Sequence, residues 1–94
     1  MQDITDKVNS FEDIKPGMAF IDDERGLIFL VVSINYELQS LNIRAFEHKN
    51  GLCRDITKSY ATNSDGLAPF AFITLRKWCR IYKLAADDIL QLLI

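Results

Sequence analysis

Apolar and polar residues alternate through the middle of the 94-residue chain, in a pattern typical of short β-strands. The clearest predicted strand is 27–36, because residues 27–32 are all apolar, as in a central strand covered on both faces. At 41–48 apolar positions alternate with polar ones, which predicts a strand with one buried face. Shorter or more polar strands are expected at 18–21 and 52–60.

Turn-forming residues separate these strands. Pro16 and Gly17 suit the two central positions of a type II turn before the first strand. Asn50-Gly51 is the strongest short hairpin signal in the chain, since both residues tolerate a positive φ. Further turns or loops are expected at 22–26, 36–40 and 61–69.

The stretch FAFITLRKWCRIYKL, residues 70–84, fits two secondary structures. As a helix it would begin a heptad-spaced apolar seam that continues toward the C-terminus. That seam consists of Leu75, Trp78, Tyr82, Ala85, Ile89 and Leu92. Because many of its residues favour the β conformation, we predict two strands instead, 70–75 and 80–84. They are joined by a tight turn at 76–79 or continue as one bent strand.

Five or six short strands joined by tight turns indicate a mainly β fold. We expect a small antiparallel barrel or sandwich of the SH3-like or OB-like kind, with a short C-terminal helix. The alternative is an α+β fold in which the apolar seam forms one long C-terminal helix. A chain of 94 residues fits a single domain, with an N-terminal arm (1–15), a β core (16–84) and a C-terminal helix (85–94). Within the last segment, paired acids suit the first turn of a helix predicted at 87–93.

The composition is that of an ordinary globular domain, with 49% hydrophobic and 26% charged residues. The longest apolar run is far shorter than the ~20 residues that cross a bilayer. The first residues do not resemble a signal peptide, so we expect a cytoplasmic protein without a membrane partner. Residues 1–40 carry a net charge of −5 and residues 41–84 a net charge of +5. Such a chain either presents a charged face to a partner or pairs its charges within the fold.

Residue types that bind metals or form covalent intermediates are sparse. Two cysteines and one histidine do not supply the closely spaced ligands of a structural zinc site. The one arrangement suited to nucleophilic chemistry is Cys53 with His48 as base and Asp55 as orienting group. A packed thiol beside an exposed histidine explains the same residues more simply. We therefore expect no metal, no cofactor and no enzymatic activity.

Aromatic and basic residues of 70–84 form the best candidate for a binding surface. In the strand interpretation they share one face, and two residues of the third strand extend that face if the strands pair. The set is Phe72, Arg76, Trp78, Arg80 and Tyr82, with Arg44 and Phe46. Aromatic residues and arginine are enriched at the centres of protein interfaces. The sequence therefore predicts a protein-binding module that acts as an adaptor, a subunit or an inhibitor.

Three alternatives stay open. In the first, Phe72, Trp78 and Tyr82 fill the core and there is no binding face. In the second, the aromatic and basic residues bind single-stranded nucleic acid, although the isoelectric point of 5.2 is low for such a protein. In the third, scattered polar residues make a small-barrel ribonuclease. Separately, Ile89, Leu92 and Leu93 either pack on the sheet or form the seam of a homodimer.

Overall fold

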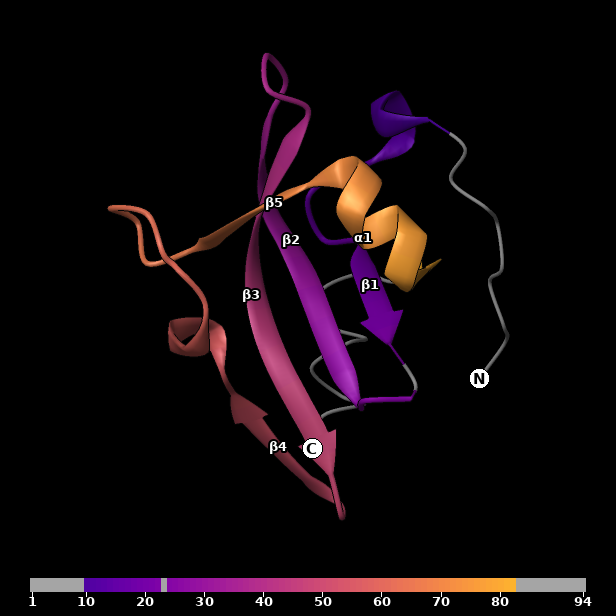
Figure 1. The fold of residues 1–94 in the computed structure, drawn as a ribbon, viewed down its shortest axis with the longest axis vertical. Helices are drawn as coiled ribbons and strands as arrows, with labels where there is room; N and C mark the ends of the chain where they lie inside the picture. Colours follow the sequence, from indigo (N-terminus) through magenta and orange to yellow (C-terminus); the bar gives the residue numbers. More distant parts are fainter. Residues whose placement is uncertain (1–9, 23, 83–94) are drawn as a thin grey trace.

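The computed structural model describes residues 10–22 and 24–82, and this part of the chain is mainly β (Figure 1). Within these residues, six strands are joined by one short α-helix, α1, and two 3-10 turns, η1 and η2. In chain order the elements are η1 (Phe11–Asp13), β1 (Ala19–Asp22), β2 (Leu27–Asn35), β3 (Ser40–Lys49), β4 (Leu52–Asp55), η2 (Thr57–Ser59), β5 (Ala68–Ala71), α1 (Phe72–Trp78) and β6 (Arg80–Tyr82). The first three strands lie within one residue of the ranges predicted from sequence.

The described strands form one antiparallel sheet in the order β4-β3-β2-β1-β6. β2 is central, between β1 and β3, as its long apolar run predicts. β5 and β4 share the outer edge of β3, because β5 pairs with its first half and β4 with its second half. Among the described strands, β4 and β6 do not pair with each other, so the sheet is open. The mainly β, antiparallel prediction is confirmed, and closure into a barrel stays a prediction.

Two turns predicted from their residues form as expected. Gly17 has a φ of 95°, and the Met18 N–H donates to the Lys15 carbonyl at 3.2 Å, which closes the turn before β1. Asn50 and Gly51 adopt φ values of 55° and 75° at the tip of the β3–β4 hairpin.

The main core lies on one side of the sheet, which we call the first face. Leu41, Ile43 and Ala45 of β3 are fully buried there, which confirms the alternation predicted for that strand. η1, β5 and α1 supply the residues that cover these strands, and Figure 1 shows α1 lying across this side. The buried residues of this core are Phe11, Ile14, Phe20, Phe29, Val31, Leu41, Ile43, Ala45, Ala68, Phe72 and Leu75.

Alternate residues of β1, β2 and β3 form a smaller apolar cluster, on what we call the second face. Ala19 and Ile28 are its buried members. Ile21, Leu30 and Phe46 pack against them and are partly buried. β2 is therefore apolar on both sides, in agreement with its unbroken apolar run.

The strand predicted at 70–75 is confirmed only for its first two residues, which end β5, and the helix α1 contradicts the rest of it and the tight turn predicted at 76–79. Phe72 and Leu75 are buried, and Cys79 packs against the same core, so residues three and four apart face the sheet. The strand interpretation required Ile73 to be buried, whereas its side chain is 75% exposed.

The alternative of one long C-terminal helix is also wrong where the structure describes the chain. The last hydrogen bond of α1 runs from the Cys79 N–H to the Leu75 carbonyl. The backbone at Cys79 is extended, so the helix ends there. The chain then forms β6, which pairs with β1 and confirms the first part of the strand predicted at 80–84. The helix predicted at 87–93 and the dimer seam predicted at Ile89, Leu92 and Leu93 lie outside the described residues.

β4 ends at Asp55, so the strand predicted to continue to residue 60 is wrong beyond that point. The chain then turns into η2. There, single hydrogen bonds to Ala45 take the place of strand pairing along the outer edge of β3. The Ile56 N–H donates to the Ala45 carbonyl at 2.8 Å, and the Ala45 N–H donates to Thr57 Oγ1 at 2.9 Å. Thr57 thereby satisfies the buried amide of β3 in the gap between β4 and β5.

Candidate functional site

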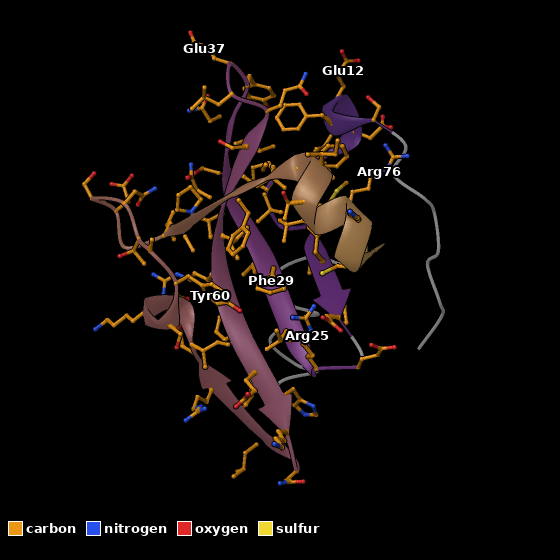
Figure 2. The ribbon with its side chains drawn as sticks, in the orientation of Figure 1. Glu12, Arg25, Phe29, Glu37, Tyr60 and Arg76 are labelled. Atoms are coloured by element: carbon orange, nitrogen blue, oxygen red, sulfur yellow. The ribbon has the colours of Figure 1, made fainter. Side chains whose placement is uncertain are left out.

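The aromatic and basic residues predicted to form one face come from separate parts of the fold. Phe72 begins α1 and is buried, with its ring centroid 5.6 Å from that of Phe11 and 6.4 Å from that of Phe20. Its predicted place on an exposed face is wrong, because it belongs to the core. Arg76 is exposed on α1 (Figure 2). Trp78 is the last residue of α1, and its side chain lies outside the description.

The other four predicted residues, Arg80, Tyr82, Arg44 and Phe46, occupy positions that align in two rows across the sheet. Strand pairing builds two adjacent rows that each cross β6, β1, β2 and β3. The first row is Arg80, Ile21, Ile28 and Phe46, and the second row is Tyr82, Ala19, Leu30 and Arg44. Arg44 and Phe46 were expected to extend the face of 70–84 only if the two strands paired. β6 and β3 do not pair with each other. The register nevertheless aligns these residues, with two strands between them.

At the β3 end of these rows the second face changes from apolar to charged. Phe46 packs with the Ile28 cluster and is half-buried. Arg44 is exposed, and its Nη1 lies 3.4 Å from Oδ2 of Asp55. Both side chains of that ion pair are about half exposed, so it contributes little to stability.

Opposite charges pair within the described part of the chain. Three arginines each contact a carboxylate, at distances between 2.8 and 3.4 Å. The pairs are Arg25–Asp22, Arg44–Asp55 and Arg54–Glu47. Each pair lies within one of the two charged segments, so none of them joins the acidic residues 1–40 to the basic residues 41–84.

His48 and Cys53 lie directly opposite each other in the β3–β4 hairpin. Within the described chain, no hydrogen bond joins either of them to Asp55, whose Oδ1 instead accepts from the Thr57 hydroxyl at 2.6 Å and the Thr57 N–H at 2.8 Å. Partial burial raises the pKa of the Cys53 thiol, and the nearby negative charge of Asp55 raises it further. A raised pKa leaves less thiolate, so this geometry does not activate a nucleophile.

The hydrogen bonds to Asp55 affect its own titration. Partial burial acts to raise the pKa of this carboxyl, but the bonds from Thr57 and the positive charge of Arg44 outweigh that effect. The net result is a pKa below the ordinary value for aspartate. Asp55 is therefore a charged acceptor that fixes η2 to the end of β4.

A small pocket of about 70 Å³ opens on the first face beside α1. Phe29, Tyr60 and Phe70 line one side of it, and their ring centroids lie 5.3 to 6.0 Å apart. Figure 2 shows Phe29 and Tyr60 on the same side of the sheet as α1. The rings contact one another, as in the edge-to-face packing of an ordinary core.

The polar groups of this pocket also have partners. Asp22 is buried, and its carboxylate accepts from the Nε of Arg25 at 2.8 Å and from the Arg25 N–H at 3.2 Å. Burial raises the pKa of the Cys79 thiol to about 11, and the negative charge of Asp22 acts in the same direction. The pocket thus contains a satisfied carboxylate and a protonated thiol, and we assign it to the packing of α1 on the sheet.

Three large apolar side chains are exposed at the end of the sheet where β2 turns into β3. Tyr36, Leu38 and Ile73 have exposed fractions of 68%, 73% and 75%. The Phe72 N–H donates to the Gln39 carbonyl at 3.1 Å, which joins the start of α1 to this turn. We call Tyr36, Leu38 and Ile73 the apolar end.

Charged residues of both signs lie around the apolar end, because Arg76 and Lys77 are exposed on α1 three and four residues after Ile73, and acids lie on the side of η1 and the β2–β3 turn. Glu37 is exposed in the β2–β3 turn, and Glu12 and Asp13 are exposed on η1. The Phe11 ring of η1 lies 6.0 Å from the Tyr36 ring, so η1 and the turn are neighbours. Figure 2 shows Glu37 and Glu12 at the same end of the molecule. None of these three acids belongs to the ion pairs of the described residues.

Sequence reasoning missed this surface, although one signal was present. The turn predicted at 36–40 contains Tyr36 and Leu38, and large apolar residues are unusual in an exposed turn. Ile73 had no such signal, because its exposure depends on the helical conformation of α1.

Comparisons with protein-family models, with curated protein sequences and with solved structures found no match to this chain. Within residues 10–22 and 24–82, no three His, Cys, Asp or Glu side chains gather closely enough to hold a metal ion. In the same ranges, no helix is both long and apolar enough to cross a membrane.

Proposed function

We propose that this chain is a small, non-enzymatic protein-binding module that occupies a partner protein's surface through the apolar end. The observation that carries the proposal is the exposure of Tyr36 and Leu38 in the β2–β3 turn, at 68% and 73%, and of Ile73, at 75%, on α1, whose start is hydrogen-bonded to that turn. Isolated exposed apolar residues are normal on a soluble protein, whereas neighbouring ones mark interaction sites.

Burial of the apolar end against a partner would supply a binding free energy comparable to that of the apolar centre of an interface. Burying a large apolar side chain contributes about 1.5–3 kcal/mol, so the three together contribute on the order of 3–6 kcal/mol once their present partial burial is subtracted. Association opposes this with a cost of similar size. The partner must therefore also contact the polar rim around the apolar end.

The charges of that rim indicate the chemistry of the partner. Glu12, Asp13 and Glu37 border the apolar end on one side, and Arg76 and Lys77 border Ile73 on α1, so the rim favours a partner whose apolar side chains are flanked by charges of both signs. Arg44 is paired with a carboxylate and Phe72 is buried, so the structure offers no specific support for the nucleic-acid alternative that used these residues.

Affinity capture with matched surface variants tests the proposal. The double variant Leu38→Asp, Ile73→Asp places charge in the apolar end, and Leu52→Asp is the control because Leu52 is 74% exposed in the β3–β4 hairpin. A partner of the apolar end is retained by the wild type and by the control, and its affinity for the double variant falls at least about a hundredfold.

Circular dichroism and thermal melting confirm that all three proteins are folded. A partner that binds the double variant as tightly as the wild type would show that the apolar end is not the binding surface. The absence of any protein that the wild type and the Leu52→Asp control both retain specifically would contradict the proposed function itself.

A further inference from the structure

The tip of the β3–β4 hairpin consists of an asparagine followed by a glycine, and both are exposed to solvent. Asn50 and Gly51 have φ values of 55° and 75°, and they alone connect the paired residues Lys49 and Leu52. Within the described chain, no hydrogen bond holds the Asn50 side chain. A Cβ added to Gly51 would meet no atom within 4 Å beyond its chain neighbours, so the space around the tip is open.

We propose that Asn50 is a site of spontaneous covalent modification, at which the backbone nitrogen of Gly51 attacks the side-chain amide carbon of Asn50. A bond forms between that nitrogen and Cγ, and the amide nitrogen leaves as ammonia with the proton that the Gly51 nitrogen releases. The product is a five-membered succinimide ring, which water then opens at one of its two carbonyl groups. Opening at Cγ gives aspartate, and opening at the backbone carbonyl gives isoaspartate, in which the chain continues through Cγ.

The residue types and their exposure favour this reaction at the hairpin tip. Asparagine is a thermolabile residue, and glycine has no Cβ to crowd the attacking nitrogen. The attack requires the backbone between Asn50 and Gly51 to rotate out of the tight turn. Little opposes this rotation, because Lys49 and Leu52 are also exposed and only the last pair of the hairpin has to open.

Hydrogen bonds hold the side chains of the other asparagines that the structure describes, which are Asn35, Asn42 and Asn63. Asn63 is the nearest competitor, because the small residue Ser64 follows it. Its Oδ1 accepts from the N–H groups of Asp65 and Leu67 at 3.0 and 3.1 Å. Its Nδ2 donates to Oδ1 of Asn42 at 3.1 Å. These bonds must break before the Asn63 amide can react, so the structure separates it from Asn50.

The two products should affect the hairpin differently. Aspartate tolerates a positive φ about as well as asparagine, so the turn is kept. Isoaspartate adds a backbone carbon to a two-residue loop, so the Lys49–Leu52 pair cannot keep its geometry. Among the described strands β4 pairs with β3 alone, which confines the damage to this edge. Figure 1 shows this hairpin and the β2–β3 turn at opposite ends of the sheet, so the proposal is independent of binding by the apolar end.

Peptide mapping of protein incubated at 37 °C and pH 7.4 tests the proposal. Trypsin cleaves after lysine and arginine, so Asn50 lies in peptide 50–54 and Asn63 in peptide 59–76. The same incubation in guanidinium chloride gives the rate at each asparagine in the unfolded chain. We expect folding to slow the reaction at Asn50 by less than about tenfold, because the tip opens readily. At Asn63 folding should slow it by at least about thirtyfold, because three hydrogen bonds must break.

The products at position 50 test the route. Protein isoaspartyl methyltransferase labels isoaspartate but not aspartate, and a succinimide must give both. Aspartate alone would show direct hydrolysis of the amide and would overturn the proposal. It would also be overturned if folding slowed the reaction at Asn50 as strongly as at Asn63. Asn50→Asp, which adds the charge without the extra backbone carbon, is the structural control and should keep the Lys49–Leu52 nuclear Overhauser contacts that the isoaspartate form loses.

Discussion

Replacing Thr57 by valine removes one hydroxyl group and leaves the shape of the side chain almost unchanged. Thr57 is 3% exposed, and its Oγ1 accepts from the Ala45 N–H at 2.9 Å and donates to Oδ1 of Asp55 at 2.6 Å. These bonds lie where neither β4 nor β5 pairs with β3. In Thr57→Val the buried amide of Ala45 therefore has no partner.

The size of the effect follows from the two bonds. An unpaired buried N–H costs about 1–3 kcal/mol. The lost bond to Asp55 adds less, because that carboxylate is 44% exposed and water can replace the hydroxyl. We expect the free energy of unfolding to fall by about 2 kcal/mol, which lowers the melting temperature of a domain this size by about 8–16 °C.

Urea denaturation followed by far-ultraviolet circular dichroism measures this difference at pH 7. Thr57→Ser is the control, because it keeps the hydroxyl and removes only a methyl group. Thr57→Ser should retain most of the stability that Thr57→Val loses. If valine is tolerated as well as serine, the hydroxyl does not satisfy the β3 edge and the account of η2 is wrong.

The pH dependence of the same pair gives a second check. The pKa of Asp55 is lowered in the folded state, so its contribution to stability is present above the unfolded value of about 3.9 and is lost as pH falls through the folded pKa. Wild type and Thr57→Val should therefore approach each other in stability below about pH 4. A difference that grows in acid would contradict the assigned hydrogen bond.

Three further measurements check other parts of the structure. Gly26→Ala should destabilise the fold more than Gly51→Ala. Both glycines have a positive φ, but only a Cβ added at Gly26 meets a backbone oxygen, that of His48 at 2.5 Å. Equal urea midpoints for the two variants would refute this. Cys79 should react with iodoacetamide at pH 8 at least about tenfold more slowly than free cysteine, with a rate that still rises above pH 10, because burial raises the pKa of its thiol to about 11; a plateau below pH 9 would contradict this. Ile73→Asp should change stability by less than about 1 kcal/mol and Leu75→Asp should unfold the protein, whereas similar losses for the two would exclude the α1 assignment.

The strands that the sequence predicts well are those whose local pattern and tertiary environment agree. β2 has an unbroken apolar run, β3 has a regular alternation, and the turn at Asn50-Gly51 has residues that tolerate the positive φ it needs. β4 was predicted too long because residues 56–60 look equally suited to a strand. Its end depends on Thr57 bonding to Ala45, a contact between residues distant in sequence.

The stretch 70–84 could not be assigned from sequence because its apolar residues satisfy two periods at once. Ile73 and Thr74 favour a strand locally, but burial of Phe72 and Leu75 against the sheet stabilises a helix. The binding surface was misplaced for the same reason, since the strand interpretation put Phe72 outside. The alignment of Arg80 with Phe46 across two intervening strands follows from sheet order, which no local pattern contains.

Site-specific photo-crosslinking tests the proposed function most directly. A benzophenone amino acid is placed at Leu38 in the apolar end and, in a separate protein, at Leu52 in the β3–β4 hairpin, two positions with exposed fractions of 73% and 74%. We predict that irradiation in lysate gives a discrete crosslinked protein from position 38 that is absent from position 52 and lost when Ile73→Asp is added. The same products from both positions, or none from position 38, would contradict the assignment of the apolar end as a protein-binding surface.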